Sequence, residues 1–180
     1  LNFSTLRQDQ WCASFRKDVE SYLATYVKRD TMKTVEDIIR VGTTSQFSKG
    51  RLLSFLNKNK RWVDEEEECL DAYNDPRRIA FRNAIESLMD SLKLDSIIYP
   101  SWNNKPARID FFEEEYKGDN NQVIAPHTGQ PAFTVPMGFT EDNLPVGLQF
   151  LGKMYDEPTL IKLTYSYEQG TKHRKPPTKN

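Results

Sequence analysis

The chain has 180 residues, a length that suits one domain or a piece of a larger one. Hydrophobic residues make up 37% and aromatic residues 12%, too many for a disordered chain, while charged residues at 28% exclude a membrane-embedded one. The 25 Lys and Arg nearly balance the 26 Asp and Glu, so charge gives no reason to expect a nucleic acid or a membrane surface as partner.

The N-terminus and the two cysteines give little chemistry. Cys12 and Cys69 are too few and too far apart for a disulfide framework or a thiolate zinc site. Asn2 begins an Asn-x-Ser glycosylation sequon, and Leu1 stands where a start Met is usual. These features favour a processed product of the secretory pathway, although the sequence otherwise leaves the compartment open.

Residues 1–95 have mainly helical spacing. Apolar residues three and four positions apart predict a helix over 9–29 with one buried face. Its predicted stripe is Phe15, Val19, Tyr22, Leu23 and Tyr26. Thr34 and Asp37 resemble a capping box that opens a short helix.

A stronger helix start follows at Asp75 and Pro76, since Asp caps free amides and Pro at the first helical position loses no needed donor. The predicted buried stripe of this helix is Phe81, Ile85, Leu88 and Leu92. Residues 96–99 then predict a buried strand that ends at Pro100. The loop after it carries Trp102, which we interpret either as a pocket wall or as a lid or core residue.

Residues 96–180 combine strands, Gly- and Pro-rich loops and a terminal helix. Residues 133–135 and 146–150 predict two strands, and the segment 138–145 between them fits a hairpin or a tight crossover. Asp156 and Pro158 predict a second capped helix. Its predicted apolar face is Leu160, Leu163, Thr164 and Tyr167. The basic segment 172–179 is interpreted as a solvated terminus.

Three stretches of the second half resemble the carboxyl-terminal part of the amidase signature family. They are Gly118-Asp119-Asn120, the run from Ala125 to Phe139 (APHTGQPAFTVPMGF) and the run from Leu144 to Gly152 (LPVGLQFLG). Residues 15–23, 95–100, 156–160 and 167–169 also resemble segments of that family. The resemblance therefore covers nearly the whole chain.

The resemblance implies an α/β fold, with residues 1–180 forming the C-terminal part of one α/β/α amidase domain. In that fold helices cover a mixed β-sheet, which here needs an N-terminal segment for completion. The family hydrolyses amide C–N bonds by acyl transfer with a Ser–cis-Ser–Lys triad in a Gly/Ser-rich signature. That signature is missing here. The nearest match, residues 42–45, has only one Gly and comes after a helix that, by the resemblance, already follows the triad. The catalytic residues are therefore expected on an upstream segment or chain, and none in this chain.

The resemblance points to three substrate-binding candidates, Asp119, His127 and Thr128, and the order of strand and loop adds Trp102 as the fourth. A carboxylate at Asp119 would face a substrate amine, unless Arg108 neutralises it or it caps its own loop. His127 and Thr128 precede the turn at Gly129 and Pro131. By the resemblance they would line the acyl or the leaving-group side of the substrate pocket, although a histidine in a loop is often only structural. Candidate structural residues of this loop are Gly129, Pro131, Pro136 and Gly138.

Two other functions stay open at this point. The protein could be a non-catalytic amidase-like binding or scaffolding subunit, or an esterase or transacylase on the same scaffold. The expected partners are the triad-carrying N-terminal segment, a small-molecule amide and, for the complete protein, a second copy. No cofactor and no metal is expected, since two histidines and scattered carboxylates make no recognisable site.

Overall fold

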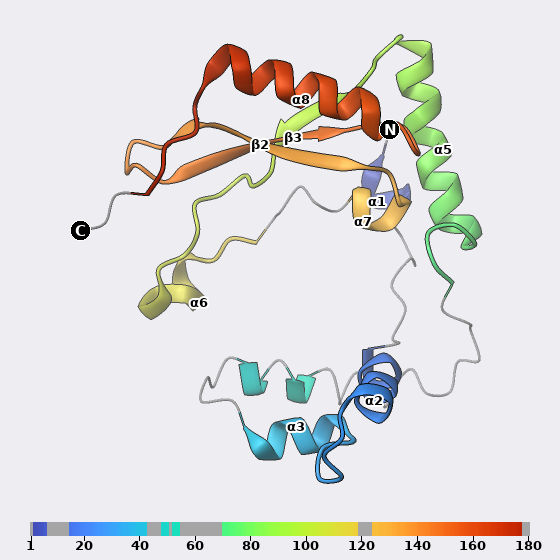
Figure 1. Cartoon of the computed structure of the whole chain (residues 1–180), viewed down its shortest axis with the longest axis vertical. Helices are drawn as coiled ribbons and strands as arrows, with labels where there is room; N and C mark the ends of the chain where they lie inside the picture. The colour runs from blue at the N-terminus through green and yellow to red at the C-terminus, as the bar shows by residue number, and fades with distance from the viewer. Residues whose placement is uncertain are drawn as a thin grey trace. The chain divides into compact units, whose positions relative to one another are not determined.

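The computed structural model describes residues 2–6, 15–42, 48–50, 52–54, 70–118 and 124–177 (Figure 1). The chain divides into two compact units, one formed by residues 11–70 and the other by residues 1–10 with 71–180. None of the helices in these described ranges is long and apolar enough to cross a membrane.

The smaller unit contains helices α2 (Phe15–Tyr26) and α3 (Val35–Val41). The predicted capping box at Thr34 is confirmed: its hydroxyl accepts from the Asp37 amide at 3.1 Å, and the Asp37 carboxylate accepts from the Thr34 amide at 3.0 Å. The predicted stripe of α2 is wrong at Tyr22 and Tyr26, which are 60% and 69% exposed. The seven-residue α3 is too short to cover the length of α2, so within this unit only Leu23 of α2 is buried.

The larger unit is built on a three-stranded antiparallel sheet in the order β1-β3-β2. Its strands are β1 (Ile97–Pro100), β2 (Ala132–Phe139) and β3 (Pro145–Leu151). Its helices are α1 (Phe3–Leu6), α5 (Pro76–Ser91), α6 (Phe112–Glu115), α7 (Ala125–Thr128) and α8 (Glu157–Thr171). Strands β2 and β3 form a hairpin, which settles the connection that the sequence left open.

Helix α5 begins at the predicted cap but buries a different stripe. The Asp75 carboxylate accepts from the Arg77 amide at 2.8 Å, and Pro76 occupies the first turn. Phe81, Ile85 and Met89 are buried, whereas Leu88 is 37% and Leu92 59% exposed. The prediction was wrong at both leucines. The buried residues Phe81, Ile85 and Met89 are each four positions apart, so their stripe turns gradually round the helix and leaves Leu88 and Leu92 to one side of it.

The two faces of the sheet belong to two hydrophobic clusters. Leu151 packs with Phe81, Ile85 and Met89, while its neighbour Phe150 packs with Val135 and Leu160. Because adjacent strand residues point to opposite faces, α8 covers one face of the sheet and α5 reaches the other (Figure 1).

The predicted burial of strand β1 and the predicted cap of helix α8 both need correction. Strand β1 pairs on one side only among the described residues, and its Ile98 is 57% exposed, so it is an edge strand rather than a buried one. Helix α8 has the predicted face, with Leu160 and Thr164 buried. However, the Asp156 side chain makes no capping hydrogen bond, because its backbone (φ −101°, ψ 39°) is not in the extended conformation of a capping residue.

The segment after α8 returns along the sheet instead of leaving it. The ring of His173 lies 6.4 Å from that of Tyr167, and Lys175 Nζ lies 5.1 Å from the centre of the Phe139 ring. Lys172, Arg174 and Lys175 themselves remain exposed, in line with the predicted basic terminus. These contacts place the basic segment beside the β2–β3 hairpin.

Candidate functional site

A pocket of about 560 Å³ lies between the loop after β1, helix α6 and the β2–β3 hairpin. Trp102 lines it and is 44% exposed, as a residue at a pocket mouth would be. The remaining lining residues are Asn103, Asn104, Lys105, Pro106, Ala107, Phe112, Tyr116, Thr140, Leu144, Pro145, Val146 and Gly147. The walls are thus largely apolar, with a few amide and hydroxyl groups that can fix the orientation of a ligand.

Local ion pairs hold this pocket in shape. Lys105, the one charged residue among the described residues of the lining, forms an ion pair with Asp142 in the β2–β3 hairpin turn. Arg108 donates its backbone amide and its guanidinium to Glu115 at 2.9 and 2.7 Å, and this guanidinium lowers the pKa of the Glu115 carboxyl. The pair fixes α6, on which Phe112 is stacked against Tyr116 at 4.8 Å between ring centres.

Asp119 lies outside the described residues, and its proposed contact with a substrate amine stays a prediction. Two observations bear on its neighbourhood. Asn104 Nδ2 donates to the carbonyl of Gly118 at 3.3 Å, so the residue that precedes Asp119 is attached to the pocket wall. Arg108, considered as a neutralising partner for Asp119, is engaged by Glu115.

His127 and Thr128 lie on α7, away from the Trp102 pocket. They are 6% and 0% exposed. Thr128 Oγ1 donates to the Ile124 carbonyl at 3.0 Å, and Arg82 Nη1 donates to the Thr128 carbonyl at 3.0 Å, which attaches α7 to α5. The structure therefore does not bring these two residues together with Trp102, and their contact with substrate remains a prediction.

Glycines control the backbone around the hairpin. Gly129 ends α7 in the left-handed conformation (φ +75°), and Gly138 (φ +134°) lies where the β2–β3 pairing becomes irregular. Pro131 directly precedes β2, and Pro136 lies within it. Gly147 was not among the candidate site residues, although an added Cβ there would lie 2.7 Å from Thr134 Cγ2. The signal in the sequence was a glycine inside a strand of alternating residues, since such a glycine often marks a place where another part of the chain comes close to the strand backbone.

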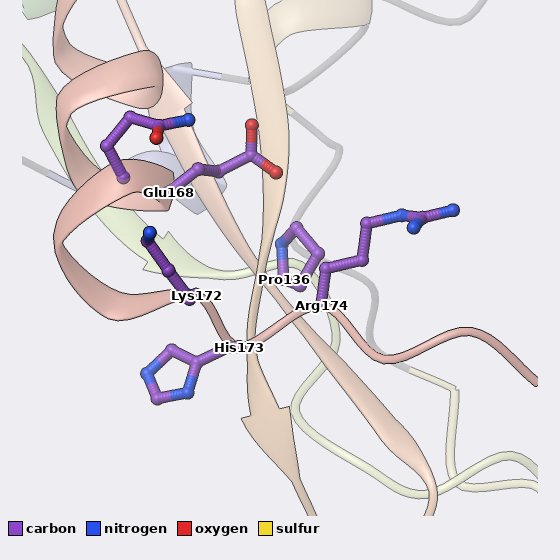
Figure 2. Close-up of a pocket in the computed structure, with 6 residues that line it drawn as sticks. Pro136, Glu168, Lys172, His173 and Arg174 are labelled. Atoms are coloured by element: carbon purple, nitrogen blue, oxygen red, sulfur yellow. The ribbon is translucent and has the colours of Figure 1, made fainter.

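A second pocket, of about 320 Å³, lies at the C-terminal end of α8 (Figure 2). Pro136, Glu168, Lys172, His173 and Arg174 line it together with Gln169. Figure 2 shows the His173 ring and the Arg174 guanidinium pointing in opposite directions, so these basic groups do not converge on one ligand.

Some buried polar atoms lack hydrogen-bond partners within the part of the chain that the structure describes, among them Arg78 Nε, Tyr99 Oη and Gln130 Oε1. Burial raises the pKa of the Tyr99 phenol to about 12, so it stays protonated at neutral pH. Over the same described ranges, no three His, Cys, Asp or Glu side chains are grouped as metal ligands would be.

These elements form a mixed α/β assembly in which a sheet carries a helix on one face and a loop-built pocket at its edge. The sequence model of the amidase family matches residues 6–161, and the chain belongs to that family.

Relatives and solved structures agree with this assignment. A probable amidase of Arabidopsis thaliana is 27% identical over 92% of this chain and 29% of its own length. A glutamyl-tRNA(Gln) amidotransferase subunit of Thermodesulfovibrio yellowstonii is 36% identical over 52% of this chain and 20% of its own. The native peptide amidase of Stenotrophomonas maltophilia superposes with a TM-score of 0.60 at 25% identity, over 91% of this chain and 33% of that one. The chain thus spans about a fifth to a third of the length of these proteins.

Proposed function

We propose that this chain is the C-terminal portion of an amidase that hydrolyses amide C–N bonds. It supplies walls of the substrate pocket, while a Ser–cis-Ser–Lys triad on an upstream segment performs the acyl transfer. The observation that carries the proposal is the pocket beside Trp102, which has apolar walls and hydrogen-bonding groups but no nucleophile with a base among its described lining residues.

The chemistry divides between the two parts accordingly. The upstream Ser attacks the amide carbonyl, the Lys and the cis-Ser pass a proton to the leaving amine, and water then hydrolyses the acyl-enzyme. This chain binds and orients the acyl group. Trp102, Phe112 and Tyr116 contribute aromatic surface, and the Lys105–Asp142 pair leaves the pocket mouth without net charge.

The length of the matches favours an amidase over an amidotransferase subunit. The amidotransferase relatives match a third to about half of this chain, whereas the probable amidase and a peptide amidase structure, 27% identical to this chain, each cover 92% of it. An amidotransferase subunit is the second candidate because of the higher identity of those shorter matches, 36% to 45%. A subunit that binds without hydrolysing is a further alternative, since the triad is expected outside this chain.

The proposal is tested by incubating the complete protein with aliphatic, aryl and amino-acid amides and with glutamine. We expect release of ammonia from apolar or aromatic amides. The Trp102→Ala variant should raise KM for an aromatic amide about three- to tenfold, since part of an aromatic contact surface is lost. Hydrolysis of glutamine alone would favour the amidotransferase candidate, and hydrolysis of none would favour the binding subunit.

A further inference from the structure

One ion pair joins the two loops that border the Trp102 pocket. Lys105 lies in the loop after β1 and lines the pocket, whereas Asp142 lies in the turn between β2 and β3 and is outside the lining. The two residues are 37 positions apart in the chain, and their charged groups are in contact. Among the described lining residues Lys105 alone is charged, so the charge that the pocket presents to a ligand depends on a residue beyond its walls.

The hairpin turn holds Asp142 in place. The Thr140 amide donates to the Leu144 carbonyl at 2.9 Å, and the Leu144 amide donates to Thr140 Oγ1 at 3.1 Å. Between them, the Asn143 amide donates to the Thr140 carbonyl at 2.9 Å, with Asn143 in the left-handed conformation (φ +60°). Because these bonds fix the backbone on both sides of Asp142, its carboxylate is carried on a defined turn.

The loop that carries Lys105 is held as well. Before Lys105, Asn104 Nδ2 donates to the Gly118 carbonyl at 3.3 Å. After it, the Arg108 guanidinium pairs with the Glu115 carboxylate. Since both loops are anchored independently of the Lys105–Asp142 pair, a substitution that removes one charge of the pair leaves the other charge beside the pocket.

The loss of either partner changes the net charge beside the pocket. The intact pair is neutral, so neither an anionic nor a cationic ligand is favoured by it. Without the Asp142 carboxylate, the Lys105 ammonium attracts an anion, and without the ammonium the carboxylate attracts a cation. The two side chains are 54% and 62% exposed, so water screens these attractions and limits them to a few-fold in affinity.

We propose that Asp142 determines the charge preference of the pocket through Lys105, so that the paired residues select amides whose acyl group is uncharged. Asp142 is then a specificity-determining residue that does not itself touch the substrate. This inference rests on the proposed function and adds the substrate class to it: uncharged acyl groups are preferred over carboxylates and amines of the same size.

The test uses three benzamides on the complete protein, which differ only in the para substituent: carboxylate, aminomethyl or ethyl. At neutral pH they are anionic, cationic and uncharged. We expect Asp142→Asn to raise kcat/KM for the carboxylate compound about threefold at low ionic strength. Lys105→Met, which keeps most of the apolar side chain, should raise kcat/KM for the aminomethyl compound by a similar factor. The ethyl compound should change by less than about 1.5-fold, and about 0.5 M NaCl should remove both gains.

Glu141 provides the matched control. It lies next to Asp142 in the same turn and has no ion-pair partner among the described residues. Glu141→Gln removes the same charge without breaking the pair, so kcat/KM should stay within about 1.5-fold for all three compounds. The double variant Asp142→Asn with Lys105→Met should lose both gains, because no charge of the pair remains.

Three results would overturn the inference: a single variant that gives no gain on its charged compound, a gain that survives in the double variant, or the same gain with Glu141→Gln. If the complete protein hydrolyses none of the three benzamides, calorimetric Kd values for them decide the charge preference, with the same pattern of gains expected. If it also hydrolyses no other amide, the proposed function fails, separately from the charge preference.

Discussion

Asp75 and Asp156 each precede a helix with proline in its first turn, yet only one of them caps. Asp75 is 2% exposed and its carboxylate accepts from Arg77 at both the amide and the guanidinium. Asp156 makes no such bond, because its backbone is turned away from the extended conformation. Sequence cannot separate the two cases, since residue type is the same and backbone angles decide.

We expect Asp75→Ala in the complete protein to lower the free energy of unfolding by about 1–2 kcal/mol, and Asp156→Ala by less than about 0.5 kcal/mol. The hydrogen bonds from Arg77 lower the pKa of Asp75. Its contribution is therefore present above the unfolded pKa of about 3.9 and lost as the pH falls through the lower folded value. Chemical denaturation at pH 6 and pH 3 should show the Asp75→Ala difference shrinking in acid. A difference that grew in acid would contradict the cap.

At the scale of elements, the turn after α7 depends on the backbone of Gly129. Its φ of +75° is unfavourable for other residues, and a Cβ there would lie 3.1 Å from Ala72 Cβ. The turn fixes the start of β2, because the Gln130 side chain donates to the Gly152 carbonyl at 2.9 Å.

We expect Gly129→Val to reduce both soluble yield and hydrolytic rate, since a β-branched residue adds strain of at least ~1–2 kcal/mol to the clash. Gly138→Ala separates backbone strain from steric clash, because φ of Gly138 is also positive but no atom lies within 4 Å of its Cβ position. It should lose less yield than Gly129→Ala. Full yield and full rate for Gly129→Val, measured by purification and amide hydrolysis, would show that the position is ordinary.

Several elements of both units could be predicted from the sequence, because caps, prolines and alternating residues act locally. The capping box at Thr34, the start of α5 and the face of α8 followed from such signals. The edge position of β1 and the exposure of Leu88 did not, since strand order and helix rotation depend on distant partners. The hydrogen bond between the hydroxyl groups of Ser101 and Thr134, 3.2 Å long, was missed for the same reason: no local pattern joins residues 33 positions apart.

At the scale of the whole molecule, the three-stranded sheet has two outer strands, β1 and β2, with no further strand beside them among the described residues. Unpaired strand edges promote association between chains. We therefore expect isolated residues 1–180 to aggregate, and coexpression with the upstream segment to restore a single species in size-exclusion chromatography. A cooperative melt of a monomeric isolated chain would contradict this expectation.

On this view the catalytic side chains lie outside this chain, while walls of the substrate pocket lie within it. Labelling the complete protein with a fluorophosphonate, followed by peptide mapping, locates the nucleophilic serine. We predict one labelled serine on the upstream segment and none within residues 1–180. A labelled serine within residues 1–180 would contradict the account.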